Sequence, residues 1–460
     1  MSNSTKKIKV LKFGGTSVKN PQRIAHVAQI VASVSADYKT IVVVSAMGDT
    51  TDSLVRLAGR CSDKPNPREL DVLLASGEQQ SIALLSIVLS DLAIKAKSFT
   101  GGQLGIITES NYGNAEILSI DAGKIDEAFV DNDVIVVAGF QGVTAAGDIT
   151  TLGRGGSDTS AVAIAAAVGA ELCDIYTDVD GIFTADPNII EGAIQHKRIS
   201  YSDCLEMAAR GAQVIHPRAV ECARENAVAL RVRSVFNPDN CGTEIGSEGE
   251  AAASGKDIVG VTAVDGFSVL KIEFDSSLIH SQLIHDTVQS EVGHVNLLET
   301  YVQAKGATVK SLSQSLLESI VSSEAANCSI ASYVVSGLNR SSGQRLVEEL
   351  ADIPGVLNAS IKFEITCVSV VGRGAAGELA RCEVAVAGVA EAGVAGTSCS
   401  CLLEDWQQKG LLEGLPPSLG ELSVALYVAY EHSRQAWKSL HEALLPSFQR
   451  EQALCQLAAV

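Results

Sequence analysis

The sequence predicts an α/β protein in which residues 8–235 form a mainly parallel sheet covered by helices on both faces. Over this range, short apolar segments alternate with segments of helical spacing, as in sheets joined by crossover helices. Hydrophobic residues make up 46% of the chain but aromatic residues only 4%, which favours α/β layers packed with Ala, Val and Gly. Glycine-rich or polar loops follow the predicted strands, and open α/β sheets bind ligands at such carboxyl ends.

Length and charge limit the other possibilities. A chain of 460 residues is expected to form roughly two to four domains. Its formal net charge of -19 repels nucleic acid and anionic membranes, so an anionic substrate requires a locally basic pocket. The 11 cysteines include no paired CxxC spacing, which indicates free thiols in a reducing compartment. No signal peptide and no apolar run of about 18 residues is visible, and we predict a cytoplasmic protein.

The predicted sheet begins with a strand at 8–13 and a glycine loop at 14–17. Consecutive backbone N–H groups in such a loop can hold phosphate oxygens, and Lys12 lies close enough to reach the same place. Strand–glycine–glycine turns are common, so this segment alone does not separate a phosphate site from a plain turn.

Two helices and a second strand are predicted next. Helical spacing at 21–34 leads to a β-branched strand at 40–44, typical of a parallel strand buried on both faces. Residues 69–92 form a long predicted helix. Within it, Glu78 would by default be a solvated carboxylate, but the neighbouring Gly77 weakens the helix and suggests a close approach by another segment.

The most informative stretch is 151–159, which reads TLGRGGSDT. Its three glycines let the backbone turn tightly and approach a ligand, and Ser157 and Asp158 are predicted N-caps of a buried helix at 159–168. Strands at 134–140 and 172–177 and a loop at 141–148 flank this stretch.

The loop at 151–159 brings backbone N–H groups and the positive end of a helix to one point, which predicts an anion site. Arg154 adds a fork of donors suited to a carboxylate or phosphate. After the strand at 172–177, polar side chains again crowd the carboxyl end: Thr177, Asp178, Asp180 and Asp186.

The segment at 206–223 closes the predicted first domain together with a last strand at 230–235. Pro217 is expected to start a helix, since proline is favoured in the first turn. We assign His216 a structural role, because no nearby residue pairs with it as a base.

Six motifs, in this order, carry a resemblance to a known family. They are KFGGTS at 12–17, SAMGDTTD at 45–52, SGE at 76–78, GFQG at 139–142, GRGGSD at 153–158 and TDVDG at 177–181. Together they resemble aspartate kinase, of the amino-acid kinase superfamily, over roughly residues 8–247. The resemblance implies a three-layer αβα catalytic domain at 1–247. It would phosphorylate the side-chain carboxylate of L-aspartate with MgATP, giving 4-phospho-L-aspartate on the route to lysine, threonine and methionine.

The resemblance also implies roles for individual residues. Lys12 would lie between the γ-phosphate and the attacking carboxylate, and Asp158 would orient Lys12 and help organise the magnesium-bound phosphates. Arg154 would pair with the α-carboxylate of aspartate and Glu78 with its α-ammonium group. Further substrate contacts would be Ser45, Thr51 and Ser157. No general base is needed, because a carboxylate is already ionised at neutral pH, and Mg²⁺ would arrive with ATP rather than at a protein metal site.

The implied ATP site has two parts. Lys12, Gly14, Gly15, Thr16 and Ser17 would surround the phosphates, and the nucleotide pocket would contain Thr177, Asp178, Phe183, Asp186, Asn188 and Gln213. Three of these positions depart from the family pattern: Phe183, Asn188 and Gln213 stand where relatives carry Tyr, Arg and Lys. These departures bear on the affinity for ATP more than on the activity itself.

The remaining residues, 256–460, follow a linker at 248–255 and are predicted to form two ACT-like regulatory modules of α+β, ferredoxin-like fold, the second diverged. Expected elements are two strands at 258–272 meeting at Gly266, a strand at 329–335, a helix at 341–350, a strand ending near 363, another at 367–372, a strand at 421–430 and a helix at 432–445. The resemblance implies a homo-oligomer formed through this region and an amino-acid effector, lysine or threonine. The unusual loop at 373–379 predicts weak feedback. The alternative is a packing or dimerisation module without a ligand.

Two other functions stay open at this stage. One is another kinase of the superfamily, acting on glutamate, N-acetylglutamate, carbamate or a nucleotide, and Glu78 with Arg154 argues against it. The other is a non-catalytic metabolite-binding or regulatory subunit, and the presence of Lys12 and Asp158 argues against it.

Overall fold

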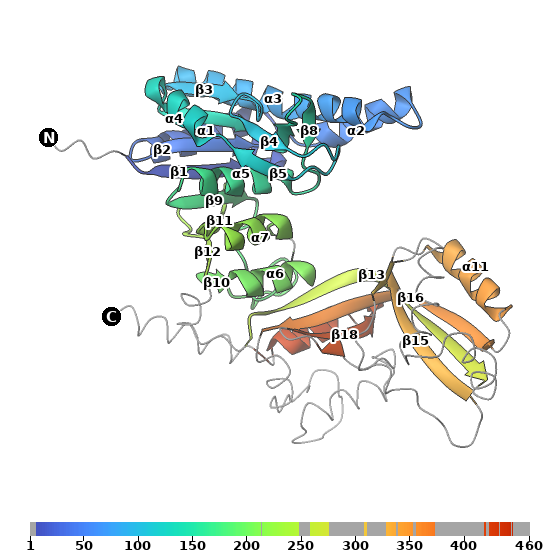
Figure 1. Cartoon of the computed structure of the whole chain (residues 1–460). Helices are drawn as coiled ribbons and strands as arrows, with labels where there is room; N and C mark the ends of the chain where they lie inside the picture. The colour runs from blue at the N-terminus through green and yellow to red at the C-terminus, as the bar shows by residue number, and fades with distance from the viewer. Residues whose placement is uncertain are drawn as a thin grey trace. The chain divides into compact units, whose positions relative to one another are not determined.

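The chain divides into two compact units, Met1–Thr184 with Ile194–Gly255 and Ala185–Ala193 with Lys256–Val460. Figure 1 shows the computed structural model and its helices and strands. The structure describes residues 6–212, 214–247, 258–275, 308–310, 328–336, 339–352, 356–372, 418–419, 423–431, 433–442 and 444. The predicted linker at 248–255 and the unusual loop at 373–379 lie outside these residues.

The first unit is built on an eight-stranded sheet in the order β10-β12-β11-β9-β1-β2-β6-β3. All described neighbours pair in parallel except β11 and β12, which are antiparallel. The strands are β1 (Ile8–Phe13), β2 (Lys39–Val44), β3 (Ala96–Phe99), β6 (Val134–Ala138), β9 (Leu172–Thr177), β10 (Arg198–Ser200), β11 (Leu230–Ser234) and β12 (Thr243–Gly246). The prediction of a mainly parallel sheet is therefore confirmed.

Helices cover both faces of this sheet. The helices are α1 (Pro21–Ser35), α2 (Thr50–Cys61), α3 (Pro67–Asp91), α4 (Ala122–Asp131), α5 (Gly156–Ala167), α6 (Tyr201–Ala209) and α7 (Pro217–Glu225), with a short 3₁₀ helix, η1 (Gly15–Val18). The chain steps one way along the sheet from β1 to β2 to β3 and the opposite way from β6 to β9. Right-handed crossovers therefore place α1 and α3 on one face and α5 on the other, which gives three layers.

One hydrophobic cluster joins the sheet to the α1–α3 layer. Alternate residues of the central strands, such as Leu11 and Phe13 of β1 and Val42 of β2, pack with Val27 of α1 and Leu85 of α3. The intervening residues Val10, Ile41 and Val43 are buried as well. Burial of both strand faces explains their nearly continuous apolar sequences.

A second, four-stranded sheet lies in the order β5-β4-β7-β8. Its strands are β4 (Ile106–Thr108), β5 (Ile117–Ile120), β7 (Gln141–Val143) and β8 (Ile149–Thr151). The predicted loop at 141–148 is confirmed only for residues 144–148, because residues 141–143 form β7, which pairs antiparallel with β8. β7 and β8 have only three residues each, which is too short for an alternating hydrophobic pattern to be recognised in the sequence.

Several other predicted boundaries need correction. The strand expected at 134–140 ends at Ala138, and Phe140 has a left-handed backbone with φ of 67°. The strand at 230–235 is not the last of the sheet, because β12 follows and pairs antiparallel with it. Among the described residues, α3 is long and apolar enough to cross a membrane by length and composition alone. However, α3 packs against α1 and β6 and carries the buried carboxylates of Asp71 and Glu78, as a core helix does.

The second unit contains a six-stranded sheet in the order β14-β15-β13-β16-β18-β17. Its described elements are β13 (Gly260–Asp275), β14 (Thr308–Lys310), β15 (Cys328–Ser336), α11 (Arg340–Ala351), β16 (Val356–Val371), β17 (Ser418–Leu419) and β18 (Ser423–Ala429). All its described strand pairs are antiparallel, and α11 packs on β16. An α+β architecture is thus present.

Two long strands replace pairs of strands expected in this unit. β13 runs unbroken through the predicted turn, although its register with β16 shifts between Val264 and Phe267, where Gly266 has φ of 89°. β16 likewise spans both strands expected between 356 and 372. Glycine at such a position permits an irregularity within a strand as readily as a turn. Positions 433–442 are helical, and Trp437 Nε1 donates to the Val261 carbonyl at 2.9 Å.

Candidate active site

A cavity of about 270 Å³ opens at the carboxyl edge of the main sheet, where the loops after β1, β2 and β6 meet the start of α5. Its size suits a small metabolite better than a drug-sized ligand. The lining residues are Lys12, Gly14, Gly15, Ser45, Thr51, Glu78, Phe140, Gly153, Arg154, Gly155, Gly156, Ser157 and Asp158. They include all seven residues expected to be catalytic or to bind the substrate, which come from five separate segments of the chain.

Lys12 and Asp158 form an ion pair in this cavity. The distance from Lys12 Nζ to Asp158 Oδ1 is 2.5 Å, and both side chains are mostly buried. Lys12 comes from the end of β1 and Asp158 from the first turn of α5. The pair therefore places one ammonium group, with its charge balanced, beside the glycine loop that follows β1.

Glu78 is the most buried charged residue of the cavity, with 2% of its surface exposed. Its Oε1 accepts the Ala46 N–H at 3.0 Å, and its Oε2 has no partner among the described residues. Burial raises the pKa of Glu78 to about 7, although the Ala46 hydrogen bond works against this rise. Gly77 explains how the loop comes so close, because a Cβ at Gly77 would lie 2.9 Å from the Ala46 Cβ. The default expectation of a solvated Glu78 is wrong.

Arg154 lies in the loop between β8 and α5. Its side chain is exposed at the cavity, and no hydrogen bond or ion pair holds it within the described part of the chain. The predicted helix follows, but Gly155 is its N-cap, with φ of 74°. Ser157 and Asp158 are therefore not caps; they lie in the first turn, where their side chains can face the cavity. The helix start still directs its positive end at the site.

The glycine loop after β1 passes close to the loop after β2. A Cβ at Gly15 would lie 2.8 Å from the Ala46 carbonyl oxygen, so only glycine fits there. Gly14 and Gly15 line the cavity, whereas Thr16 and Ser17 do not. Ser17 is buried, and its hydroxyl has no partner among the described residues.

The described residues among those predicted for the nucleotide pocket are not part of this cavity. Thr177 ends β9, and its hydroxyl donates to Asp178 Oδ1 at 3.0 Å. Phe183 forms an isolated bridge with Gln195. Asp186 and Asn188 belong to the segment that groups with the second unit, where Asp186 Oδ1 accepts the Asn188 backbone and side-chain N–H groups. Gln213 lies outside the described residues.

Asp71 is a buried anchor that the sequence analysis missed. Its Oδ2 accepts the backbone N–H groups of Thr151 and Gly113, and its Oδ1 accepts the Thr151 hydroxyl. Asp71 belongs to none of the six motifs and precedes the motif at 76–78 by five residues, so no motif pointed to it. Its place on the buried face of α3 was the available signal. Asp71 fixes the residue that leads into the Arg154 loop.

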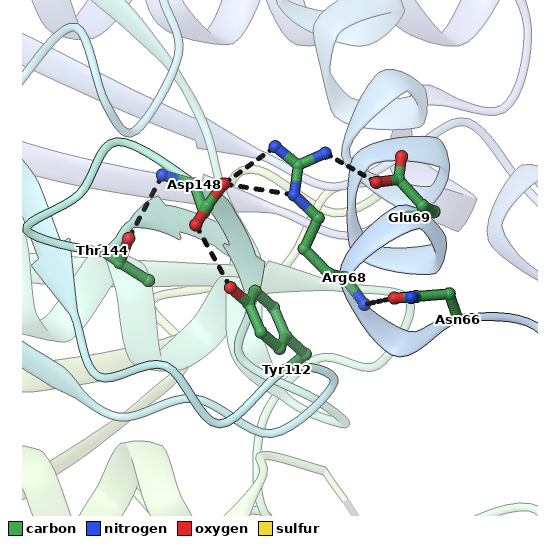
Figure 2. Close-up of polar contacts among 6 residues, drawn as sticks. All are labelled: Asn66, Arg68, Glu69, Tyr112, Thr144 and Asp148. Carbon is green, nitrogen blue, oxygen red and sulfur yellow. Dashed lines mark hydrogen bonds and ion pairs between the residues drawn. The ribbon is translucent and has the colours of Figure 1, made fainter.

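A second tie between α3 and the β7–β8 hairpin lies nearer the surface (Figure 2). Arg68 Nε and Nη2 donate to Asp148 Oδ1 at 3.1 and 2.8 Å, and Arg68 Nη1 donates to Glu69 Oε1 at 2.8 Å. The Tyr112 hydroxyl donates to Asp148 Oδ2 at 3.3 Å. Hydrogen bonds from Arg68 lower the pKa of Asp148. This cluster supports the hairpin and contributes no group to the cavity.

His216 has the structural place expected of it. It is the N-cap of α7, and its Nδ1 accepts the Arg218 N–H at 3.3 Å. Burial lowers the pKa of His216 despite the nearby Asp158, so a neutral ring that can accept this bond is favoured at neutral pH. Pro217 begins the helix, as predicted.

Comparison with known proteins identifies the first unit. The model of the amino acid kinase family matches residues 7–234, and this part of the chain belongs to that family. Within the family, it is similar to aspartokinases. It is 55% identical over 226 residues to aspartokinase from Geobacillus stearothermophilus, which covers 49% of this chain and 56% of the relative. It is 50% identical over 249 residues to aspartokinase from Thermus thermophilus, which covers 54% of this chain and 62% of the relative.

These sequence matches thus span little more than half the length of the relatives. Solved structures extend the likeness in fold. Escherichia coli aspartokinase III, in complex with lysine and aspartate, superimposes with a TM-score of 0.67 over 95% of this chain and 99% of its own, at 22% identity. Clostridium acetobutylicum aspartate kinase gives a TM-score of 0.66 with the same coverage, at 20% identity. The likeness in fold to these two structures therefore covers more of the chain than the sequence matches do.

Proposed function

We propose that the protein is an aspartate kinase, which transfers the γ-phosphate of ATP to the side-chain carboxylate of L-aspartate. The observation that carries the proposal is one small cavity that contains the Lys12–Asp158 ion pair, the unpaired guanidinium group of Arg154 and the buried carboxylate of Glu78. The similarity of residues 7–234 to aspartokinases supports the same reaction.

The two ends of an amino acid match the two unpaired charges. Arg154 offers a planar fork of donors to the α-carboxylate, and Glu78 Oε2 offers an acceptor to the α-ammonium group. Glu78 is held rigidly by the Ala46 N–H, so it orients the substrate as well as attracting it. In a chain of net charge -19, Arg154 supplies the positive charge that a carboxylate substrate needs, because it has no partner among the described residues, whereas Lys12 is already paired with Asp158. Ser45, Thr51 and Ser157 are the polar groups left to contact the rest of the substrate.

The reaction needs positioning and charge neutralisation more than acid–base chemistry. A side-chain carboxylate oxygen of aspartate forms a bond to the γ-phosphorus, and the bond from that phosphorus to the β–γ bridging oxygen breaks, which releases ADP. No proton moves, because the attacking carboxylate is already ionised at neutral pH. Lys12 stabilises the charge that spreads over the transferred group, and Asp158 fixes the position of its ammonium group.

The phosphates are expected to lie at the glycine loop and the start of α5. Gly14 and Gly15 present backbone N–H groups there, with Thr16 and Ser17 beside them. Mg²⁺ bound to ATP would neutralise phosphate charge, and Asp158 is the carboxylate in the cavity that suits it, since carboxylate and phosphate oxygens are its preferred ligands. Thr177, Asp178, Phe183, Asp186, Asn188 and Gln213 stay the proposed contacts of the nucleotide itself.

The proposed cellular setting follows from the reaction. An enzyme that consumes ATP and free aspartate at the start of lysine, threonine and methionine synthesis is expected to act in the cytoplasm. We propose residues 1–247 as its catalytic domain and 256–460 as an ACT-like regulatory region of two modules, through which copies of the chain associate.

An assay of ADP release with a panel of acceptors tests the proposal. We expect turnover that depends on L-aspartate and is at least about 100-fold slower in kcat/KM with L-glutamate, because an extra methylene displaces the reacting carboxylate. N-acetylglutamate lacks the free ammonium group that pairs with Glu78 and should not be used. Preference for either of these acceptors would assign the protein to a different amino-acid kinase, and no ATP turnover with any of them would favour a non-catalytic role.

A further inference from the structure

The loop between β8 and α5 is held from outside the cavity by residues that do not line it. Arg218, in the first turn of α7, donates from Nη1 to the Leu152 carbonyl at 2.7 Å and to Asn114 Oδ1 at 2.9 Å. Leu152 is fully buried and stands two residues before Arg154. One guanidinium group therefore fixes the entry to the loop that carries Arg154.

Two glycines seat the same loop against the neighbours of Arg218. A Cβ at Gly153 would lie 2.8 Å from Asn114 Oδ1, and a Cβ at Gly155 would lie 2.1 Å from Cγ of His216. Both glycines have φ of 74°, which other residues rarely adopt. The backbone on each side of Arg154 is thus in contact with Asn114 or His216.

His216 and Arg218 act on the loop as one unit. His216 Nδ1 accepts the backbone N–H of Arg218 at 3.3 Å, which caps α7 and fixes the two residues relative to each other. Helix α7 packs against α5. The contacts of Arg218 with Leu152 and of His216 with Gly155 therefore come from a helix that is itself held in place.

Arg154 has no such support of its own. No polar side chain or backbone group in the described part of the chain binds its guanidinium group. A free arginine side chain loses rotamer freedom when it is fixed. Its placement toward a bound carboxylate therefore depends on the backbone of its loop. Asp71 binds Thr151 and the Phe140 carbonyl accepts the Leu152 N–H, while Arg218 holds the Leu152 carbonyl, the bond nearest to Arg154 among these.

We propose that Arg218 is a positioning residue for substrate binding: by holding the Leu152 carbonyl, it sets the place from which Arg154 reaches the α-carboxylate of the amino-acid substrate. This inference rests on the proposed function. Arg218 does not line the cavity, so it acts through Arg154 rather than by touching the substrate.

Steady-state kinetics of the full chain test this role. Arg218→Met retains much of the aliphatic length but removes both hydrogen bonds. We expect kcat/KM for aspartate to fall about tenfold, with KM for ATP unchanged within about twofold. Arg218→Lys should recover part of the loss, since an ammonium group can still donate to one of the two acceptors. Arg224→Met is the matched control, because Arg224 is exposed on the last turn of the same helix and should match the wild type.

A double-mutant cycle with Arg154 separates positioning from a general loss of structure. In an Arg154→Met background, Arg218→Met should have no further effect on kcat/KM for aspartate, because no guanidinium group is left to position. Full multiplication of the two losses would overturn the proposal, as would an equal loss in the affinity for ATP. Thermal denaturation shows whether Arg218→Met folds. If it does not, Arg218→Lys replaces it in the double-mutant cycle with Arg154→Met, and the same two outcomes apply.

Different results contradict the proposed function and the positioning role of Arg218. A wild-type protein without aspartate-dependent turnover contradicts the proposed function. A wild-type protein that uses aspartate normally, together with Arg218 variants that are indistinguishable from it, contradicts the positioning role alone.

Discussion

Lys12 and Asp158 are 2.5 Å apart, and the chemistry proposed here depends on what each does for the other. An ammonium group that meets the transferred phosphoryl group stabilises charge that appears mainly in the transition state. Lys12→Ala should therefore lower kcat by roughly 10²–10³-fold and change KM for aspartate much less. Steady-state kinetics at saturating ATP measure both values. A variant with near-normal kcat would falsify the role of Lys12.

Glu78 gives the site a pH dependence whose sign follows from its burial. Its pKa is raised to about 7, so below that pH the side chain is neutral and cannot pair with the substrate's ammonium group. KM for aspartate should rise about tenfold between pH 8 and pH 6, while KM for ATP stays nearly constant. Glu78→Gln should bind aspartate weakly and remove this dependence. A Glu78→Gln profile parallel to that of the wild type would assign the titration to another group.

The residues of the site were largely predictable because their motifs are local. Short glycine-containing stretches indicate tight turns directly in the sequence, and they contain Lys12, Arg154, Ser157 and Asp158. The burial of Glu78 was not predictable, because it depends on the loop after β2 packing on α3. The roles of Asp71 and Arg218 were missed for the same reason. Each side chain binds a segment that is distant in sequence, and the spacing of residues along the chain does not predict such contacts.

At the scale of elements, α3 is tied to the β7–β8 hairpin in two unequal ways. Asp71 is 1% exposed and accepts three hydrogen bonds, whereas the Arg68 and Asp148 side chains are 41% and 34% exposed. Asp71→Ala should lower the free energy of unfolding by about 2–4 kcal/mol, since buried donors lose their acceptor. Arg68→Met should lower it much less, because ion pairs between exposed side chains contribute little to stability.

Urea denaturation of the two variants checks this ranking, with the wild type measured alongside. Asp71→Ala should also lower activity with aspartate, because Thr151 leads directly into the Arg154 loop. Equal destabilisation by the two variants would show that the exposed cluster in Figure 2 supports the hairpin as strongly as the buried carboxylate does.

Strand prediction succeeded where burial on both faces makes a segment continuously apolar, as in β2 and β6. It failed for the short strands β7 and β8, and for the boundary within β13, where a glycine with positive φ interrupts the register without ending the strand. The cap of α5 was misplaced because Gly155 takes the left-handed position, and serine and aspartate look equally suitable in sequence.

At the scale of the whole molecule, regulation is the open question. An effector acts only through different affinities for two states of the catalytic unit. We expect the full chain to form a dimer or higher oligomer, and lysine or threonine to inhibit it only weakly, because the sequence at 373–379 departs from the family's effector loop. Light scattering and activity at increasing lysine, threonine or both test this. A monomer would contradict the first expectation, and strong inhibition at micromolar concentration the second.

The most direct test of the central claim is the chemical nature of the product. Phosphorylation of a carboxylate gives an acyl phosphate, which hydroxylamine converts to a hydroxamate, whereas a phosphate ester does not react. With ATP, L-aspartate and hydroxylamine, the wild-type protein should form the side-chain hydroxamate of aspartate in equal amount to the ADP released, and Lys12→Ala should form almost none. Release of ADP without hydroxamate would contradict the account, because the phosphate would then have gone to water or to another acceptor.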